Sequence, residues 1–280
     1  MAEIAGAVLI TGCSTGIGRA TAELLARDGN IVYATARRTE SIEDLRASGC
    51  RTLALDVNDE ASMSAAVAAV EDAEGAVGAL VNNAGYSQSG AVESVPLDSV
   101  RAQFETNVFG LLRMCQLVLP GMRRAGRGRI VNVSSMGGKL VFPGGGIYHA
   151  TKHAVEALSD AMRFEVKGFG VQVVLIEPGL IKTNFAETAV GSIGADDGPY
   201  AGFNDAVGAA TAGAYDGFLG KLGAGPEAVA KAIQSALSAR RPRPRYRVTP
   251  SARLMLTQRK LMPDRAWDAM VGTSFPRPGA

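Results

Sequence analysis

Short apolar runs alternate with segments of helical pattern along the first two thirds of the chain. Six runs are short, rich in β-branched residues and apolar at nearly every position, namely Ala7–Thr11, Ile31–Thr35, Thr52–Leu55, Ala79–Asn82, Arg129–Val133 and Val171–Ile176. Because neither face of such a run is polar, we expect buried strands of a parallel sheet that is covered on both sides. Helical periodicity predicts helices at about 17–28, 59–74, 97–124 and 147–167. This alternation predicts a three-layer α/β/α fold with a doubly wound parallel sheet.

The regular alternation ends in the last third of the chain. The stretch 191–225 is rich in Gly and Ala and shows little helical periodicity, which predicts a long loop at the mouth of a site. A further helix is expected at about Glu227–Ala239. We therefore predict one domain over residues 1–239, in which about 184–225 form the substrate loop. A C-terminal helical extension over 240–280 is expected to pack on this domain.

Charge and cysteine content exclude several classes of protein. Basic and acidic side chains number 29 and 27, and the resulting formal net charge of +2 gives no general signature of nucleic-acid binding. No apolar run is long enough to span a bilayer, and the N-terminus carries no basic leader, so we expect a cytoplasmic protein that is not integral to a membrane. Three widely spaced cysteines without a CxxC pair predict neither a disulfide framework nor a zinc site.

Residues 240–280 depart from this balance, because they carry ten basic side chains against only Asp264 and Asp268. A basic tail can be attracted to an anionic membrane or a polyanion. The charges form no long uninterrupted block, and no amphipathic anchor is evident. We therefore expect a solvated or ion-paired surface rather than a membrane contact.

Candidate chemistry begins directly after the first predicted strand, in the glycine-rich turn Thr11–Gly18 (TGCSTGIG). Such a turn, leading from a strand into a helix, presents backbone N–H groups and a helix N-terminus to an anion such as a dinucleotide pyrophosphate. The GxxxGxG spacing alone also fits an ordinary strand–helix turn. Its place after a buried strand favours a nucleotide site and a Rossmann-type sheet.

The segment after the second strand is basic, with Ala36 followed by Arg37 and Arg38. Enzymes selective for NAD usually carry an acidic residue at this place, which accepts the ribose hydroxyls. A guanidinium instead suits a 2′-phosphate by charge and geometry. The alternative is that both arginines are surface charges before the next helix. We expect NADP(H) to be preferred over NAD(H).

A tyrosine and a lysine with helical spacing form the second candidate group. Tyr148 and Lys152 are four residues apart, so both side chains share one face of the predicted helix. A free phenol has a pKa near ~10, and a nearby ammonium favours its ionised form, which makes it a usable acid or base. Ser135 follows a buried strand at the carboxyl edge of the sheet, where ligands bind in open α/β folds. The neighbouring Ser134 is expected to point to the opposite face.

Two other patterns have a simpler explanation than a functional site. The only histidines, His149 and His153, have the spacing of two metal ligands on a helix. No Glu, Asp or Cys completes a recognisable set, so we expect no metal. The apolar stripe of the predicted helix 97–124 is typical of a core or of a subunit interface.

Taken together, these residues resemble the short-chain dehydrogenase/reductase family over roughly Ala5 to Phe185. The matching segments occur in the family order and spacing: Thr11–Gly18, Asp56–Val57, Asn82–Gly85, Asn107, Val133–Ser135, Tyr148–Lys152 and Pro178–Thr183. Arg37, together with the segment Arg245–Val248, is most similar to the NADP(H)-preferring branch that resembles 17β-hydroxysteroid and retinol dehydrogenases.

The resemblance implies a role for each matching position. Tyr148 would be the general acid/base, and Lys152 would lower its pKa and bind the nicotinamide ribose. Ser135 would polarise the substrate carbonyl, and Asn107 would complete a proton relay through water. The cofactor-binding positions would be Gly12, Ser14, Thr15, Gly16, Ile17 and Gly18 at the pyrophosphate, Arg37 at the 2′-phosphate, Asp56 and Val57 at the adenine, Asn83, Ala84 and Gly85 at the adenosine ribose, and Pro178, Gly179, Ile181 and Thr183 at the carboxamide.

We therefore expect an NADP(H)-dependent oxidoreductase that interconverts a secondary alcohol and a ketone. Its substrate is expected to be hydrophobic, such as a steroid or retinoid, and its assembly a homodimer or homotetramer. The alternative is a non-catalytic NADP(H)-binding sensor or scaffold on the same fold. The presence of Asn107, Ser135, Tyr148 and Lys152 together favours the enzyme.

Overall fold

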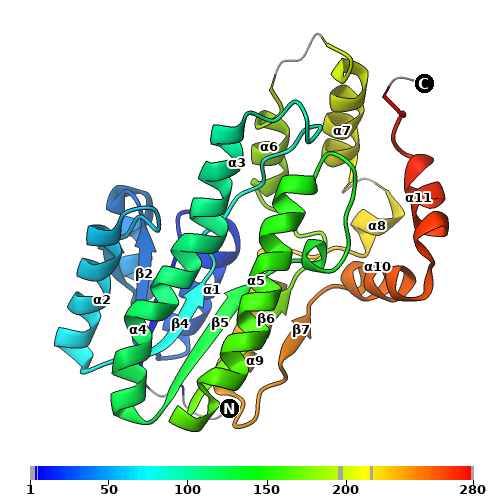
Figure 1. Ribbon diagram of the computed structural model, residues 1–280. Coiled ribbons are helices and arrows are strands. Elements are labelled where there is room, and N and C mark those ends of the chain that lie inside the picture. Colours follow the sequence, from blue (N-terminus) through cyan, green and yellow to red (C-terminus); the bar gives the residue numbers. More distant parts are fainter. Residues whose placement is uncertain (1–3, 5, 195–197, 215–216, 279–280) are drawn as a thin grey trace.

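One parallel sheet forms the middle layer of the protein (Figure 1). The computed structural model describes residue 4 and residues 6–194, 198–214 and 217–278. Within these residues the sheet has seven strands in the order β3-β2-β1-β4-β5-β6-β7, and each neighbouring pair is parallel. The strands are β1 (Ala7–Ile10), β2 (Val32–Ala36), β3 (Arg51–Ala54), β4 (Val77–Asn82), β5 (Gly128–Val133), β6 (Val171–Glu177) and β7 (Arg245–Arg247). The predicted doubly wound α/β fold is confirmed.

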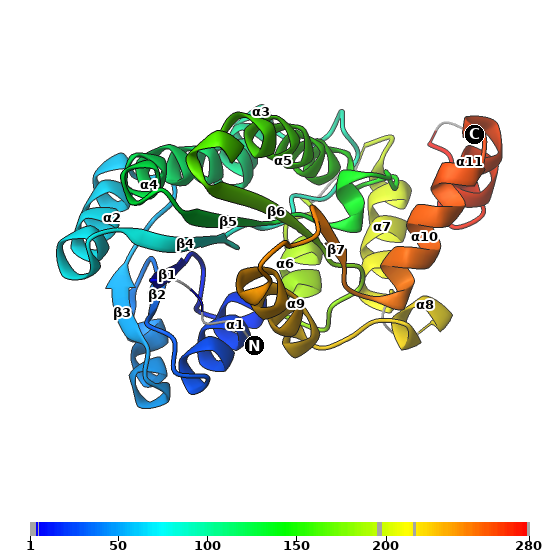
Figure 2. The same ribbon diagram turned by 90° about the horizontal axis from the view of Figure 1, so that it is seen from below.

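Helices cover both faces of the sheet, as Figure 2 shows in a view that separates the layers. The α-helices are α1 (Gly16–Arg27), α2 (Glu60–Glu74), α3 (Leu97–Phe104), α4 (Leu111–Ala125), α5 (Gly146–Glu165), α6 (Phe185–Gly191), α7 (Ala201–Gly213), α8 (Phe218–Lys221), α9 (Pro226–Ser238), α10 (Pro250–Leu261) and α11 (Asp264–Gly272). Helices α2, α4 and α5 lie on one face, and α1 and α9 pack side by side on the other. Among the described residues, no helix is long and apolar enough to cross a membrane.

The apolar strands form two cores because neighbouring side chains point to opposite faces of the sheet. Leu9 and Leu80 lie at paired positions of β1 and β4 and pack with the residues of α2, α4 and α5. Val8 and Ile10 pack instead with α1 and α9. All four side chains are fully buried. Helices therefore pack against both faces of the sheet and hold its carboxyl edge in place.

Helices α3 and α4 correspond to the single helix predicted at 97–124. A π-helical turn over Glu105–Gly110 joins them, and Pro120 lies inside α4. π-helical turns inside longer helices are frequent at functional sites, because they redirect one side chain out of register. Asn107 lies in this turn and is buried.

The segment 184–225 differs from the prediction of a loop without regular structure. Its described residues form α6, α7 and α8, so that prediction is wrong; residues 195–197 and 215–216 lie outside the described residues. Helix α7 is rich in Ala, which has the highest helix propensity, but its small residues form no apolar stripe. Asn204 on α7 also accepts a hydrogen bond from the Ala91 N–H at 2.8 Å, which fastens the helix to the body of the protein.

The C-terminal region contributes a strand as well as helices. β7 adds to the edge of the sheet beside β6, with Ile176 paired to Tyr246. Helices α10 and α11 then form a third apolar cluster around Leu140 and Trp267. The helical extension is as predicted, whereas the strand was not expected. The domain boundary at residue 239 stays a prediction, although β7 lies beyond it and belongs to the same sheet.

Candidate active site

A cavity of about 700 Å³ opens at the carboxyl edge of the sheet. Every cofactor position predicted from the sequence lines it except Gly18, and both Ser135 and Tyr148 line it as well. Residues that are up to 171 positions apart in the sequence, such as Gly12 and Thr183, therefore line the same cavity. Ligands of open α/β sheets bind at this edge.

The glycine turn between β1 and α1 needs glycine for close packing. Gly12 has φ +73°, and a Cβ there would lie 2.9 Å from the Ala84 Cα. Gly18 lies behind the cavity wall, where a Cβ would come within 2.3 Å of the Gly12 carbonyl oxygen. The Asn83 side chain donates to the carbonyl oxygens of Thr11 and Gly12 at 3.0 and 2.9 Å. Asn83 thus braces the turn, while its neighbours line the cavity.

Helix α1 presents its N-terminus to the cavity. It begins at Gly16, and the side chain of its N-cap residue Thr15 accepts no hydrogen bond from the first turn. Ser14, Gly16 and Ile17 line the cavity at this end. Backbone N–H groups of a first helical turn without a side-chain cap suit an anionic group such as a phosphate.

The far end of the cavity lies beyond β2 and β3. Arg37, directly after β2, is exposed and lines the cavity, whereas Arg38 does not. Asp56 and Val57 line the same end, and the Asp56 Oδ1 accepts a hydrogen bond from the Asn58 N–H at 3.0 Å. The structure therefore brings one guanidinium to this end and directs the other away from it.

Lys152 is buried beside Tyr148 on α5. Its Nζ donates to the Val133 carbonyl oxygen at 2.9 Å and lies 5.8 Å from the centroid of the Tyr148 ring. Burial lowers the pKa of Lys152 to about 8, and the negative charge of Glu156 on the same helix opposes this effect. The buried cation is therefore held next to the phenol by its own helix and by the end of β5.

Ser135 caps the short helical turn that follows β5. Its Oγ accepts a hydrogen bond from the Gly137 N–H at 3.0 Å, which leaves the hydroxyl proton for another acceptor. The neighbouring Ser134 also lines the cavity and is buried, and its Oγ has no partner among the described residues. The choice between the two serines rests on the spacing to Tyr148 and stays a prediction.

Asn107 lies behind the cavity wall rather than in it. Its Oδ1 accepts from the Tyr86 N–H at 3.1 Å, and its Nδ2 donates to the Tyr86 carbonyl oxygen at 2.9 Å and to the Thr151 Oγ at 3.1 Å. A Cβ on Gly85 would lie 3.0 Å from Oδ1 and 3.8 Å from the Lys152 Nζ. Asn107 thus links the segment after β4 to α5, close to Lys152, and its role in a water relay stays a prediction.

His149 is a cavity residue that the sequence analysis considered only as a metal ligand. Its ring is buried, and because a carbonyl oxygen only accepts, Nδ1 donates to the Gly137 carbonyl oxygen at 3.1 Å. Burial lowers the pKa of His149 to about 4, so the ring is neutral at physiological pH. The sequence could have indicated that His149 lies in the cavity, because it follows Tyr148 directly.

The mouth of the cavity is apolar on the side of α6. Phe185 begins this helix, and its ring lies 5.4 Å from the Tyr148 ring in an edge contact. Leu180 and Tyr86 line the same region. Helix α6 is fastened across the cavity because the Gln88 side chain donates to the Ser192 carbonyl oxygen at 2.6 Å. The Tyr148 phenol therefore lies beside an apolar part of the cavity wall.

Comparisons with known proteins agree with this geometry. Residues 6–192 match the family described as short chain dehydrogenase. The chain is 41% identical to a 3-ketodihydrosphingosine reductase of Bacteroides thetaiotaomicron, over 64% of this chain and 65% of that protein. It is 34% identical to an NADPH-dependent 3-dehydrocapnine reductase of Ornithobacterium rhinotracheale, over 93% and 94% of the two chains. It is 41% identical to 17-beta-hydroxysteroid dehydrogenase type 1 of Mus musculus, over 67% and 57%.

A solved structure is similar to this protein over nearly all of the chain. The chain superposes on a short-chain dehydrogenase of Streptomyces avermitilis with a TM-score of 0.77 and 33% identity, and 95% of each chain is covered. The extension after the family match, from residue 193 onward, therefore has a counterpart in another protein of this fold.

Proposed function

Because the chain belongs to the short-chain dehydrogenase family, we propose that it is an NADP(H)-dependent oxidoreductase that interconverts a secondary alcohol and a ketone. The observation that carries the proposal is the position of the buried Lys152 ammonium beside the Tyr148 phenol, at the wall of the cavity that Ser135 also lines. A sensor or scaffold protein has no use for a lysine whose burial is costly. A phenol that acts as acid and base does need such a lysine, because a neighbouring positive charge favours the ionised form of the phenol.

The residues present fit a dinucleotide. Gly12 and Gly16 have positive φ values of 73° and 60°, and side chains there would obstruct the turn. Ser14, Gly16 and Ile17 would hold the pyrophosphate, and Pro178, Gly179, Ile181 and Thr183 the carboxamide. Lys152 would also hold the nicotinamide ribose. When bound, the cofactor supplies or accepts the hydride, and the protein contributes alignment and a proton.

The protein side of the chemistry follows from three side chains. In ketone reduction, the Tyr148 hydroxyl gives its proton to the substrate oxygen, and in alcohol oxidation the phenolate takes it back. The positive charge of Lys152 favours the phenolate. The Ser135 Oγ accepts from the Gly137 N–H at 3.0 Å, and its hydroxyl proton can donate to the substrate oxygen. Asn107 would complete a relay through water toward the solvent.

We propose a preference for NADP(H) over NAD(H), which Arg37 supports. This guanidinium lines the end of the cavity that follows β2, and no carboxylate occupies the position directly after that strand. A guanidinium forms charge-assisted hydrogen bonds with a phosphate, whereas an acidic residue would pair with ribose hydroxyls.

The proposed substrate is a bulky, apolar ketone or alcohol. The rings of Phe185 and Tyr86 and the side chain of Leu180 give the mouth of the cavity an apolar wall. Two of the relatives are named as reductases and a third as a hydroxysteroid dehydrogenase, and all three names fit an interconversion of ketone and alcohol.

Assembly and location are part of the same proposal. Phe109, Phe164 and Phe169 expose 51%, 85% and 50% of their surface beside α4 and α5, which supports a homodimer or homotetramer. The three cysteines are buried and unpaired, as suits a reducing, cytoplasmic compartment. Light scattering of the purified protein tests the subunit number, and a monodisperse monomer would contradict it.

The function is tested with a panel of steroid, retinoid and long-chain ketones, each mixed with NADPH or with NADH. We expect NADPH absorbance to fall with at least one apolar ketone and far more slowly with NADH. Tight NADPH binding without turnover across the panel, in both reaction directions, would favour the sensor instead.

A further inference from the structure

Two carboxylates are buried directly behind the candidate active site. Glu156 lies one turn after Lys152 on α5, and Glu177 ends β6 directly before Pro178; they are 2% and 0% exposed. Burial raises the pKa of Glu177, and the charge of Glu156 raises it further. Buried carboxylates that repel each other need a cation between them.

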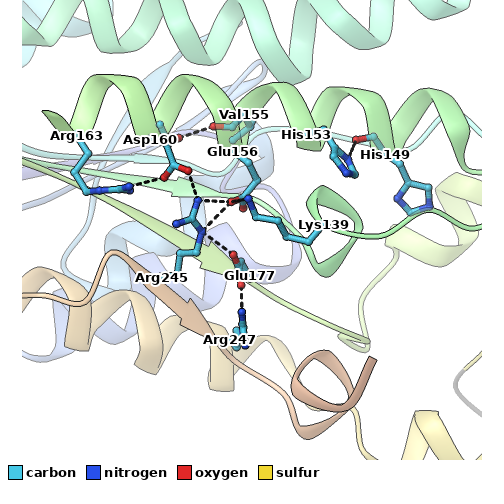
Figure 3. A network of polar contacts seen from close by, with 11 residues as sticks. Lys139, His149, His153, Val155, Glu156, Asp160, Arg163, Glu177, Arg245 and Arg247 are labelled. Carbon is cyan, nitrogen blue, oxygen red and sulfur yellow. Dashed lines mark hydrogen bonds and ion pairs between the residues drawn. The ribbon is translucent and has the colours of Figure 1, made fainter. Parts of the chain in front are cut away.

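Arg245 of β7 supplies that cation. Figure 3 shows its guanidinium between Glu156, Glu177 and Asp160. Nitrogen–oxygen distances are 3.0 Å to Glu156, 3.0 Å to Glu177 and 2.6 Å to Asp160. The contact with Glu156 is a hydrogen bond from Nε. One side chain from the C-terminal region thus joins α5 to β6.

The remaining partners of the two carboxylates lie closer to solvent. Lys139, in the segment after Ser135, reaches the Glu156 Oε2 at 3.0 Å but is 38% exposed. Arg247 donates to the Glu177 Oε2 at 3.3 Å and is 50% exposed. Exposed cations stabilise a buried charge less than a half-buried one that bridges two carboxylates. Arg245 is therefore the main counterion of the pair.

We infer that Arg245 is a positioning residue of the active site, which holds Lys152 and the Pro178–Gly179 turn in place by pairing with Glu156 and Glu177. The inference rests on the proposed function only in treating those segments as catalytic and cofactor-binding. Arg245 lies beyond residues 6–192 that match the family, so the match does not assign it a role. One charge of the basic C-terminal region thereby acquires a role inside the protein.

Arg245 influences Lys152 through the negative charge of Glu156. The groups that face the Lys152 ammonium are Tyr148 and Glu156 on α5 and the Val133 carbonyl at the end of β5, with the Asn107 amide behind Gly85. Glu156 is the anion among them. Arg245 fixes the position of the Glu156 carboxylate, and any displacement of this anion from the Lys152 ammonium would let Lys152 lose its proton at a lower pH.

Arg245→Met is the direct test, with Arg243→Met as its matched control. Arg243 is exposed in the same segment, lies over the Tyr246 ring at 5.1 Å, and pairs with no carboxylate among the described residues. For Arg245→Met we expect kcat to fall by about tenfold to a hundredfold, with a smaller change in KM, because Lys152 and the cofactor turn lose their alignment. The basic limb of the kcat profile should move to lower pH. Wild-type kcat and pH profile in Arg245→Met, or equal effects in both variants, would overturn the inference.

Glu156→Gln separates charge from shape. We expect this variant to shift the basic limb as Arg245→Met does, and the double variant to shift it no further. Arg245→Lys keeps a cation and should restore most of the wild-type profile. Additive shifts in the double variant, or no rescue by lysine, would contradict a path through Glu156. These two variants also decide the question if Arg245→Met fails to fold.

The ligand-free protein gives a readout that does not depend on activity. The folded-state pKa of Glu177 is already raised by burial, and loss of Arg245 should raise it further above its unfolded value. The variant then loses additional stability as pH rises through this folded-state pKa, so the difference in free energy of unfolding between wild type and Arg245→Met should grow as pH rises above ~4.3, the unperturbed pKa of a glutamate. A difference that is independent of pH would overturn the inference. If no ketone is turned over by any variant, the proposed function fails while this measurement still decides the role of Arg245.

Discussion

The two ends of the cavity differ in what forms them: one end depends on the backbone and the other on side chains. The end that we propose for the cofactor (the cofactor end) depends on backbone, since Gly12 and Gly18 occupy places where no side chain fits. The end that we propose for the substrate (the substrate end) depends on side chains, such as that of Phe185 on α6, whose ring contacts Tyr148. A backbone requirement leaves a residue-specific signature, whereas an apolar wall can be built from many side chains.

The helices that follow α6 also pack through side chains. The segment after Ser135 contacts the apolar cluster of α10 and α11, and Phe203 on α7 lies 6.4 Å from Phe275 between ring centroids. Substitutions in these helices should leave the glycine turn unchanged. One substitution should disable both ends together, and three others, each with a matched control, should affect one end alone.

Tyr148→Phe removes the proton donor that the two ends share. We expect kcat to fall by roughly 10² to 10⁴, the range for general acid–base catalysis, because the substrate oxygen would no longer receive a proton from the protein. The NADPH dissociation constant, measured by titration, should change little. Near-normal turnover in the folded variant would remove Tyr148 from the mechanism.

Gly12→Ala breaks the cofactor end, and Gly29→Ala is its matched control. Both glycines have positive φ values, +73° and +82°, but only at Gly12 would the new Cβ meet backbone atoms. Gly29→Ala should cost about 1 kcal/mol of stability from backbone strain alone. Gly12→Ala should cost about 1–3 kcal/mol more through overpacking and weaken NADPH at least about tenfold.

Calorimetry and denaturant unfolding of both variants measure these costs. Equal losses at the two glycines, with unchanged NADPH affinity, would mean that the turn between β1 and α1 has no special packing requirement.

Arg37→Ala tests the choice of cofactor, with Arg38→Ala as the control that stays outside the cavity. Loss of a charged hydrogen-bonding group should weaken NADPH roughly ten- to hundredfold and leave NADH nearly unchanged. Titration of both cofactors against both variants decides the matter. The same loss for NADPH and NADH would make Arg37 an ordinary surface charge.

Phe185→Ala should weaken only the substrate end. Removal of this ring should raise KM for a large apolar ketone by about tenfold, the scale of one aromatic contact, and leave NADPH binding unchanged. Leu261→Ala, which removes a 76% exposed apolar side chain at the end of α10 outside the cavity, serves as the control. A rise in the NADPH dissociation constant with Phe185→Ala would show that the two ends are not separable.

The sequence predicted most of the cofactor end because its signals are local. The turn Thr11–Gly18 and the pair Tyr148 and Lys152 follow from spacing within a few residues, and the structure places them in one cavity. The alternation of apolar runs likewise predicted six of the strands. The seventh, Arg245–Arg247, has three residues with two arginines, so no apolar pattern marks it.

What the sequence did not reveal depends on contacts between distant residues. Arg245 and Glu156 are 89 positions apart, and nothing in either segment indicates the other. Helix α7 was missed because its alanines fold as a helix without an apolar stripe, and its Asn204 is held by the distant Ala91 N–H. Asn107 was found by position, but its place behind Gly85 follows only from the π-helical turn that carries it.

The central claim is that this protein moves hydride between NADP(H) and an apolar ketone or alcohol. The most direct measurement uses NADPH that carries deuterium at both C4 positions. It is incubated with the purified protein and a ketone from the panel, and the product is analysed by mass spectrometry. We predict an alcohol that carries a single deuterium at the carbinol carbon, formed far more slowly by Tyr148→Phe. Binding of NADPH with no labelled alcohol from any ketone of the panel, and no ketone from the corresponding alcohols with NADP⁺, would contradict the claim.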